Sequence, residues 1–178
     1  GLARMDRLNI RHVPVADERG MILGMVSQRD GLRHRTRAAL TLDDALHEAH
    51  DPAALAAAFG RVPQVAAHLI DEGLSGIDIA RVISTELREV TARAAELAAG
   101  ALKAEGRGEA PAPWCLIVLG SAGRGESLLG ADQDNALIHA GSDSDDLWFA
   151  LLGERIAETL DEAGIPRCKG GVMAARAE

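Results

Sequence analysis

No part of the sequence limits the choice of fold more than residues 114–138, where two apolar runs flank a glycine-rich turn. The stretch WCLIVLG, residues 114–120, is a continuous apolar run of the kind found in buried strands. The turn GSAGRGE follows from Gly120, and a second apolar run, NALIHA, begins at Asn135. A strand that enters a turn of small residues leaves backbone N–H groups free to face an anion. The pattern therefore predicts a strand, a turn suited to a phosphate, and a second strand.

The glycines of this turn have the spacing of a phosphate-binding P-loop, G-x-x-x-x-G-K-[ST], but Glu126 stands where that motif requires lysine. A carboxylate in this place would repel a phosphate. The sequence therefore argues against a P-loop NTPase, and taken alone GSAGRG would be a tight structural turn.

Two further carboxylates, Asp132 and Asp134, precede the second apolar run. Alternate side chains of an extended chain share a face, so we expect both carboxylates to point the same way. Adjacent anions repel unless a cation joins them, and Mg²⁺ prefers oxygen ligands. The pair predicts a metal site in which Mg²⁺, in place of the missing lysine, neutralises the phosphate during phosphoryl or nucleotidyl transfer. The simpler interpretation of DQDN is a turn, because Asp and Asn are common where chains reverse.

The stretch LGSAGRGESLLGADQDNALI, residues 119–138, resembles the DUF294 family of nucleotidyltransferases. That family is related to the catalytic domain of the PII uridylyltransferase and to the nucleotidyltransferase fold of DNA polymerase β. CKGGVMA, residues 168–174, fits the same family. The resemblance implies an α+β protein with a partial CBS unit, a helical bundle, and then a nucleotidyltransferase-type mixed sheet with flanking helices. It also implies transfer of UMP or AMP from a nucleoside triphosphate to an acceptor, such as a regulatory protein.

The resemblance implies roles for individual residues near the turn. Gly120 and Ser121 would contact the phosphates of the nucleotide, with Arg124 completing the turn together with Glu126. Lys169 would be a neighbour of the phosphates.

The resemblance also assigns the two aspartates and the metal. Asp132 and Asp134 would be the catalytic residues and would hold Mg²⁺ or Mn²⁺. Active members of the fold usually supply a third carboxylate from a later strand, often as the base that deprotonates the acceptor. The stretch RCKGGVMAAR, residues 167–176, contains no acid. A catalytically inactive module that senses nucleotides therefore stands as the alternative function.

Near the N-terminus, residues 8–31 are expected to form a strand, a turn and a second strand, with strands at His12–Ala16 and in MILGMVS. This stretch resembles the second half of a CBS domain. The resemblance implies that Ser27 touches the phosphate and Asp30 the ribose of an adenine nucleotide. The same two residues also have the spacing of a helix capping box, and both interpretations stay open. Because a working CBS cleft usually needs a pair of units, a homodimer is a further expectation.

Between these regions the pattern is helical. Proline at position 63 predicts a break in a helix that runs through residues 51–73, and a long helix follows Ser75. The apolar residues of the long helix recur every three or four positions and predict one buried stripe: Ile79, Ile83, Leu87, Val90, Ala94, Leu97 and Ala101. KAEGRGEAPAP, residues 103–113, is the predicted linker. We therefore predict three parts: half a CBS domain at 1–36, a helical segment at 37–106, and an incomplete nucleotidyltransferase core at 107–178.

Composition excludes several classes of partner. The net charge of -8 and the small number of aromatic residues (two Trp, two Phe, no Tyr) argue against binding to nucleic acid. We find no signal sequence and no membrane span, so no membrane partner is expected. Two cysteines, Cys115 and Cys168, lie far apart without metal-type spacing. A cytoplasmic location is the expectation.

Overall fold

The computed structural model describes residues 10, 12–17, 19–27, 42 and 44–175, and the chain divides into two compact units, Gly1–Thr41 and Leu42–Glu178. Mixed helices and small antiparallel sheets make the protein an α+β protein, as predicted. The second unit contains both the helical segment and the residues after the predicted linker. Each unit is described by itself below.

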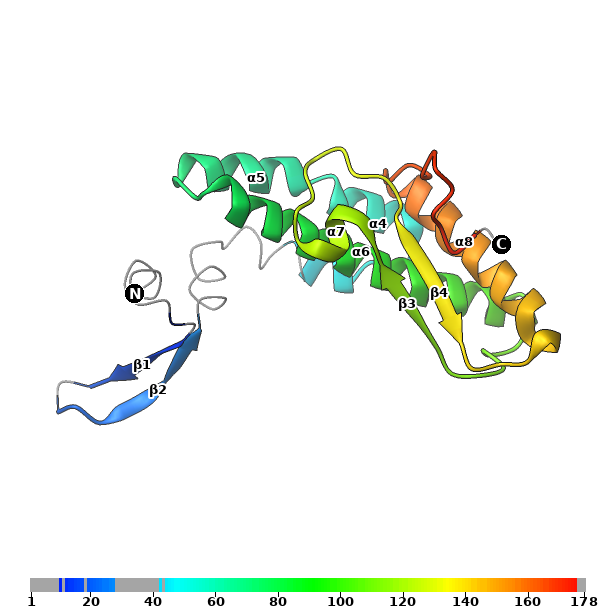
Figure 1. Ribbon diagram of the computed structural model, residues 1–178, viewed down its shortest axis with the longest axis horizontal. Helices are drawn as coiled ribbons and strands as arrows, with labels where there is room; N and C mark the ends of the chain where they lie inside the picture. Colours follow the sequence, from blue (N-terminus) through cyan, green and yellow to red (C-terminus); the bar gives the residue numbers. More distant parts are fainter. Residues whose placement is uncertain (1–9, 11, 18, 28–41, 43, 176–178) are drawn as a thin grey trace. The chain divides into compact units, whose positions relative to one another are not determined.

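The described residues of the first unit form an antiparallel hairpin of β1 (His12–Ala16) and β2 (Ile22–Ser27), which confirms the predicted strand, turn and strand (Figure 1). Asp17 closes the turn, since its Oδ1 accepts hydrogen bonds of 2.9 Å from the backbone N–H groups of Arg19 and Met21. Ser27 is the last residue of β2, whereas Asp30 lies outside the described residues. The assignment of this hairpin to a CBS domain remains a prediction.

The second unit begins its helical layer with α4 (Pro52–Phe59) and α5 (Val62–Asp71). Asp51 caps α4, because its Oδ1 accepts a 2.7 Å hydrogen bond from Ala54 N–H. The predicted break is present: α4 ends at Phe59 with Gly60 as its C-cap, and Pro63 lies in the first turn of α5, where a backbone N–H would have no helical partner.

Pro52–Asp71 is also long and apolar enough, by length and composition alone, to cross a membrane. The structure divides this stretch into two helices, and Leu55 and Leu69 are fully buried in the second unit. Packed core helices have the same composition, so the stretch carries little weight as a membrane segment.

The long helix α6 (Gly76–Ala104) is the central element of the second unit. Ser75 caps it by accepting a hydrogen bond from Asp78 N–H. The first five residues of the predicted stripe, from Ile79 to Ala94, are buried. Beyond them the buried positions are Ala95, Ala98 and Leu102, while the predicted Leu97 and Ala101 are only half-buried. The helix is covered by different neighbours along its length, so one straight stripe does not describe its whole buried face.

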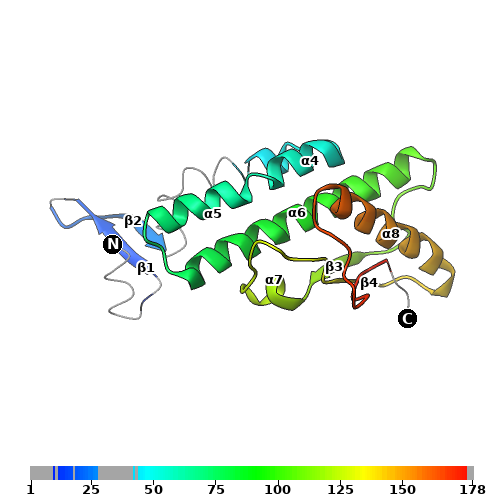
Figure 2. The same ribbon diagram turned by 90° about the horizontal axis from the view of Figure 1, so that it is seen from above.

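Figure 2 shows α6 between the α4–α5 pair and a layer made of β3 (Trp114–Val118), α7 (Gly120–Arg124) and β4 (Asn135–His139). A short 3₁₀ helix, η1 (Asp143–Asp145), leads into α8 (Asp146–Glu162), which packs against α6, α4 and β4. β3 lies within the apolar run predicted at residues 114–120, and β4 begins at Asn135, where the second apolar run was expected.

The sheet of the second unit consists of β3 and β4 paired antiparallel, with Leu116 opposite Leu137. Within the described residues, a parallel neighbour that would make this sheet mixed is not present. Residues 165–174 instead contact residues 133–135, where β4 begins, without forming a strand. They also cross α8 at backbone distance, since a Cβ at Gly153 would lie 2.1 Å from the carbonyl oxygen of Ala174.

Candidate active site

The candidate site starts where β3 ends. Leu119 leads into α7, a single helical turn that contains Gly120 and Ser121 and is closed by Gly125 in the left-handed conformation at φ +78°. Two of the glycines are required by close packing. A Cβ at Gly123 would lie 2.5 Å from the carbonyl oxygen of Val118, and a Cβ at Gly120 would lie 2.0 Å from Asp134 Oδ2. The turn therefore folds tightly against the end of β3 and against the carboxylate of Asp134.

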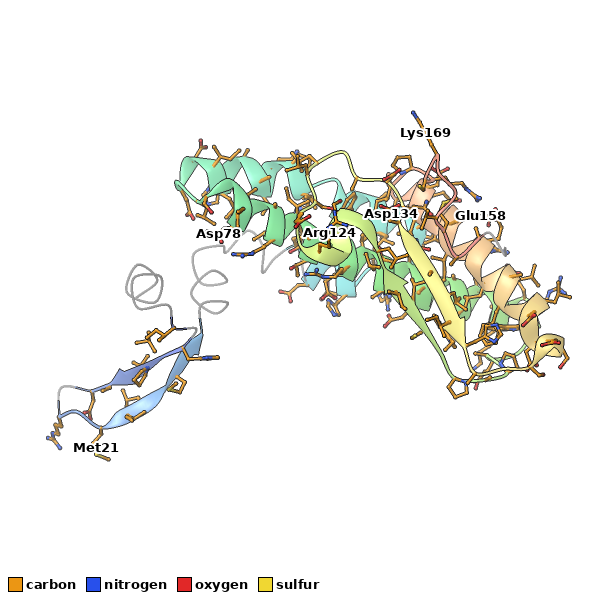
Figure 3. The ribbon with its side chains drawn as sticks, viewed as in Figure 1. Met21, Asp78, Arg124, Asp134, Glu158 and Lys169 are labelled. Atoms are coloured by element: carbon orange, nitrogen blue, oxygen red, sulfur yellow. The ribbon has the colours of Figure 1, made fainter. Side chains whose placement is uncertain are left out.

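Asp134 continues the ladder between the two strands. Its carbonyl oxygen accepts a 2.8 Å hydrogen bond from Leu119 N–H, directly before the turn. Because Gly120 has φ +56° and no side chain, the Asp134 carboxylate occupies the space beside it. Figure 3 shows Asp134 beside the α7 turn that carries Arg124. The structure thus brings together two predicted site residues from separate segments, Gly120 and Asp134.

The burial pattern around Asp132 and Asp134 is consistent with the predicted common direction of their side chains. Burial alternates along residues 132–135: Asp132 is exposed and Asp134 half-buried, while Gln133 and Asn135 are buried. Alternation of this kind places residues 132 and 134 on one side of an extended chain. Both aspartates precede β4, which begins at Asn135.

The two buried amides between and after the aspartates hold this segment to the rest of the unit. Gln133 Nε2 donates to the carbonyl oxygens of Ala157 (3.0 Å) and Ile165 (2.9 Å). Asn135 Oδ1 accepts a 2.9 Å hydrogen bond from Ala174 N–H. These roles of Gln133 and Asn135 were not predicted from the sequence. The alternation of acids and amides in DQDN does indicate them, because it suggests that the two amides share the buried side of the segment.

Backbone contacts attach residues 165–174 to the same segment. Gln133 N–H donates to the carbonyl oxygen of Pro166 at 3.0 Å, and Asn135 N–H donates to that of Val172 at 3.2 Å. The loop between these contacts carries Lys169, which is exposed and projects outward in Figure 3. The loop is therefore a neighbour of the aspartates, but the Lys169 side chain is directed into solvent.

Arg167 fixes this loop to α8. Its Nη2 donates a 2.6 Å hydrogen bond to Glu154 Oε1, and this contact raises the pKa of Arg167 above its usual range. The Arg167 guanidinium is therefore paired with α8 through Glu154.

Glu126, which occupies the lysine position of the P-loop pattern, is paired within the turn. Arg124 Nε donates a 2.9 Å hydrogen bond to Glu126 Oε2, and both side chains are 63% exposed. An exposed ion pair of this kind contributes little to stability. The positive charge of Arg124 nevertheless offsets the negative charge of Glu126, which would otherwise repel a phosphate near the turn.

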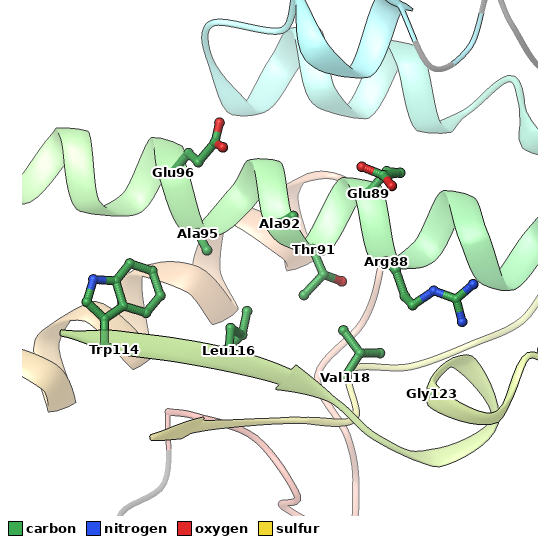
Figure 4. Close-up of a pocket in the computed structure, with 10 residues that line it drawn as sticks. All are labelled: Arg88, Glu89, Thr91, Ala92, Ala95, Glu96, Trp114, Leu116, Val118 and Gly123. Carbon is green, nitrogen blue, oxygen red and sulfur yellow. The ribbon is translucent and has the colours of Figure 1, made fainter. Parts of the chain in front are cut away.

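A groove of about 520 Å³ lies between α6 and β3 (Figure 4). Its lining includes Trp114, Leu116 and Val118 from β3, together with Arg88 and Glu89 from α6. Residues paired across two antiparallel strands share a face, and Val118 is paired with Asn135. The groove is therefore on the opposite face of the sheet from Asp134, and it is not the candidate phosphate site.

Among the residues that the structure describes, no three His, Cys, Asp or Glu side chains form a group that could hold a metal ion. Asp132 and Asp134 are two carboxylates separated by one residue in the sequence. Such a pair supplies part of the oxygen ligands of a divalent cation, which can take the remainder from substrate phosphates and water.

The structure therefore places a glycine turn against the end of β3 and the carboxylate of Asp134 beside that turn. Residues 60–178 match the family model described as Putative nucleotidyltransferase DUF294, and the chain belongs to that family. The matched region contains α5 to α8 and every residue of the candidate site in the second unit. No curated protein and no solved structure matches the chain.

Proposed function

We propose that this chain is a Mg²⁺-dependent nucleotidyltransferase that moves a nucleoside monophosphate, UMP or AMP, from a nucleoside triphosphate to an acceptor. Membership of the DUF294 family supports the general nucleotidyltransferase role and a nucleoside triphosphate substrate. One observation carries the location of the site: the Asp134 carboxylate lies against Gly120, so that a cation bound by Asp134 would be next to the turn.

The residues present fit a divalent cation, because both aspartates lie on one side of a segment whose other side is buried. Mg²⁺ or Mn²⁺ held there would neutralise the charge of the triphosphate and favour attack by an acceptor hydroxyl. Gly120 gives close access to the backbone of the turn, and the Ser121 hydroxyl would donate to a phosphate oxygen. Lys169 would need to change its side-chain direction to reach the same phosphates.

A regulatory protein is the proposed acceptor, as in uridylylation of PII, and the cytoplasm is the proposed location. The hairpin of the first unit would report the adenylate level to the transferase through Ser27 and Asp30, with pairing of two chains completing the CBS cleft. These proposals rest on the sequence resemblance alone.

Transfer can be tested with α-³²P-labelled UTP or ATP, Mg²⁺, the full chain and a lysate that provides acceptors. We expect label on a macromolecule with the wild type and its loss with Asp134→Ala. Asp71→Ala is the matched control, because Asp71 is an exposed aspartate of α5 outside the site. Equal labelling by wild type and Asp134→Ala would refute the proposed site.

A second candidate function is a nucleotide-sensing module that binds the triphosphate without turnover. The observation in its favour is that, in the part of the chain that the structure describes, a third acid does not join Asp132 and Asp134. Calorimetry would separate the two functions: Mg²⁺-dependent binding of triphosphate without transferred label would favour the sensor. Asp30→Ala should then weaken binding of AMP and leave binding at the aspartates intact.

A further inference from the structure

Three serine hydroxyls connect the long helix α6 with the candidate phosphate turn. Ser84, from α6, accepts a 2.9 Å hydrogen bond from Ser127 N–H, and Ser127 Oγ lies 2.8 Å from Ser121 Oγ. Ser84 and Ser127 are both fully buried, with 0% of their surface exposed. Ser121 is half-buried and belongs to α7. Buried polar groups are costly unless each has a hydrogen-bond partner. Two buried serines that lead to the half-buried Ser121 therefore suggest that the hydroxyl of Ser121 has a function.

The donor and acceptor of each hydrogen bond can be assigned by starting from Ser84. Ser84 Oγ donates its proton to the carbonyl oxygen of Ala80 at 2.7 Å, which leaves its lone pairs to accept from Ser127 N–H. Within the described residues, Ser121 Oγ is the hydrogen-bond partner of the Ser127 hydroxyl. A buried O–H that donates to nothing costs the full desolvation of the donor, so Ser127 donates and Ser121 accepts.

With this direction, the proton of Ser121 has no acceptor among the residues that the structure describes. An O–H that accepts one hydrogen bond and keeps its own proton is a donor toward the outside, which is what a phosphate oxygen requires. With the opposite direction, Ser121 would present only lone pairs to an anion and would repel it. The buried hydroxyl of Ser127 therefore determines how Ser121 can act.

We infer that Ser127 and Ser84 are positioning residues that orient the hydroxyl of Ser121 toward a bound phosphate. The inference rests on the proposed function, in which Ser121 contacts the triphosphate. Ser84 holds the backbone of Ser127, and Ser127 directs the proton of Ser121; neither touches the substrate.

The turn has a second attachment that does not involve these hydroxyls. Arg88 Nη1, also from α6, donates a 3.0 Å hydrogen bond to the carbonyl oxygen of Ala122. Gly123 N–H donates to the carbonyl oxygen of Leu119 at 2.9 Å. Removal of the Ser127 hydroxyl should therefore leave the turn in place, so that proton direction and backbone position can be tested separately.

The test uses isothermal titration of the full chain with magnesium tripolyphosphate, which presents phosphates without a base or sugar. Ser121→Ala and Ser127→Ala should each weaken binding about tenfold, equal to about 1.4 kcal/mol. The double variant should also be about tenfold weaker than wild type, because both changes remove the same hydrogen bond to the ligand. Ser127→Cys, which offers a weaker S–H donor of similar size, should bind with intermediate affinity.

Thr91→Ala is the matched control, because Thr91 is also a buried α6 hydroxyl that donates to the carbonyl oxygen four residues earlier. Its loss should lower the melting temperature without changing the affinity. A purely structural role predicts the same behaviour for Ser127→Ala, and that result would overturn the inference alone. Losses that multiply to about a hundredfold in the double variant would also overturn it. A wild type that binds no magnesium tripolyphosphate would overturn the proposed function together with the inference.

Discussion

The contact between Gly120 and Asp134 can be tested by a series of glycine-to-alanine substitutions in one loop. At Gly120 the backbone is left-handed, at φ +56°, and a Cβ would lie 2.0 Å from Asp134 Oδ2. At Gly125 the backbone is left-handed, at φ +78°, but the nearest atom to a Cβ is Arg81 Cγ at 3.8 Å. Gly125→Ala therefore measures the backbone strain alone, whereas Gly120→Ala adds displacement of the carboxylate.

The expected magnitudes follow from these contacts. A left-handed conformation costs an L-residue about 1–2 kcal/mol, so both substitutions should lower the free energy of unfolding by about that amount. Rotation of Asp134 moves Oδ2 and Cγ away from the new methyl group, but Asp134 Cβ would still lie 3.1 Å from it. Gly120→Ala should therefore be somewhat less stable than Gly125→Ala, and it should lose most of its affinity for magnesium tripolyphosphate.

Two further glycines complete the series. Gly123→Ala should cost more stability, because its Cβ would meet the carbonyl oxygen of Val118 at 2.5 Å and backbone cannot rotate away. Gly130→Ala, with no atom within 4 Å, should change neither quantity. Urea denaturation followed by circular dichroism gives the stabilities, and calorimetry gives the affinities. If Gly120→Ala bound the polyphosphate as well as Gly125→Ala does, the position of Asp134 beside the turn would not matter for binding.

Three other substitutions have defined outcomes. Gln133→Leu should lower the free energy of unfolding by about 1–3 kcal/mol, because it leaves the carbonyl oxygens of Ala157 and Ile165 without the amide donor; an unchanged urea midpoint would contradict the proposed anchoring. Ser75→Ala should cost about 1 kcal/mol by removing the cap of α6, with exposed Ser144→Ala as the control; equal midpoints for the two variants would show that the cap contributes nothing. Glu126→Gln should change the stability by less than about 1 kcal/mol, since its ion pair with Arg124 is exposed to solvent, and a larger loss in the same denaturation experiment would count against that assignment.

Local signals in the sequence were sufficient for most of the secondary structure. The continuous apolar run at Trp114–Val118, the proline at position 63 and the serine cap at Ser75 each act within a few residues, and each predicted element is present. The end of the α6 stripe was predicted less well. Residues 97 and 101 fit the helical period, but the packing of other elements against the C-terminal part of α6 buries Ala98 and Leu102 instead.

The candidate site was predictable in outline because its parts lie close together in the sequence. The glycine turn and the aspartates are only a loop apart, so their spacing in the sequence indicates the contact that the structure shows between Gly120 and Asp134. The serines behind the turn could not be found in this way. Ser84 and Ser127 are 43 positions apart, and only the packing of α7 on α6 makes them partners.

The position of α6 has a consequence for how this protein loses its structure. The helix packs against α4 and α5, which precede the predicted linker, and against β3, α7 and α8, which follow it. Its most buried residues, such as Val90 and Ala94, lie in the middle of this packing and are fully buried. Heating should therefore melt Leu42–Glu178 in a single cooperative transition, without a surviving helical half.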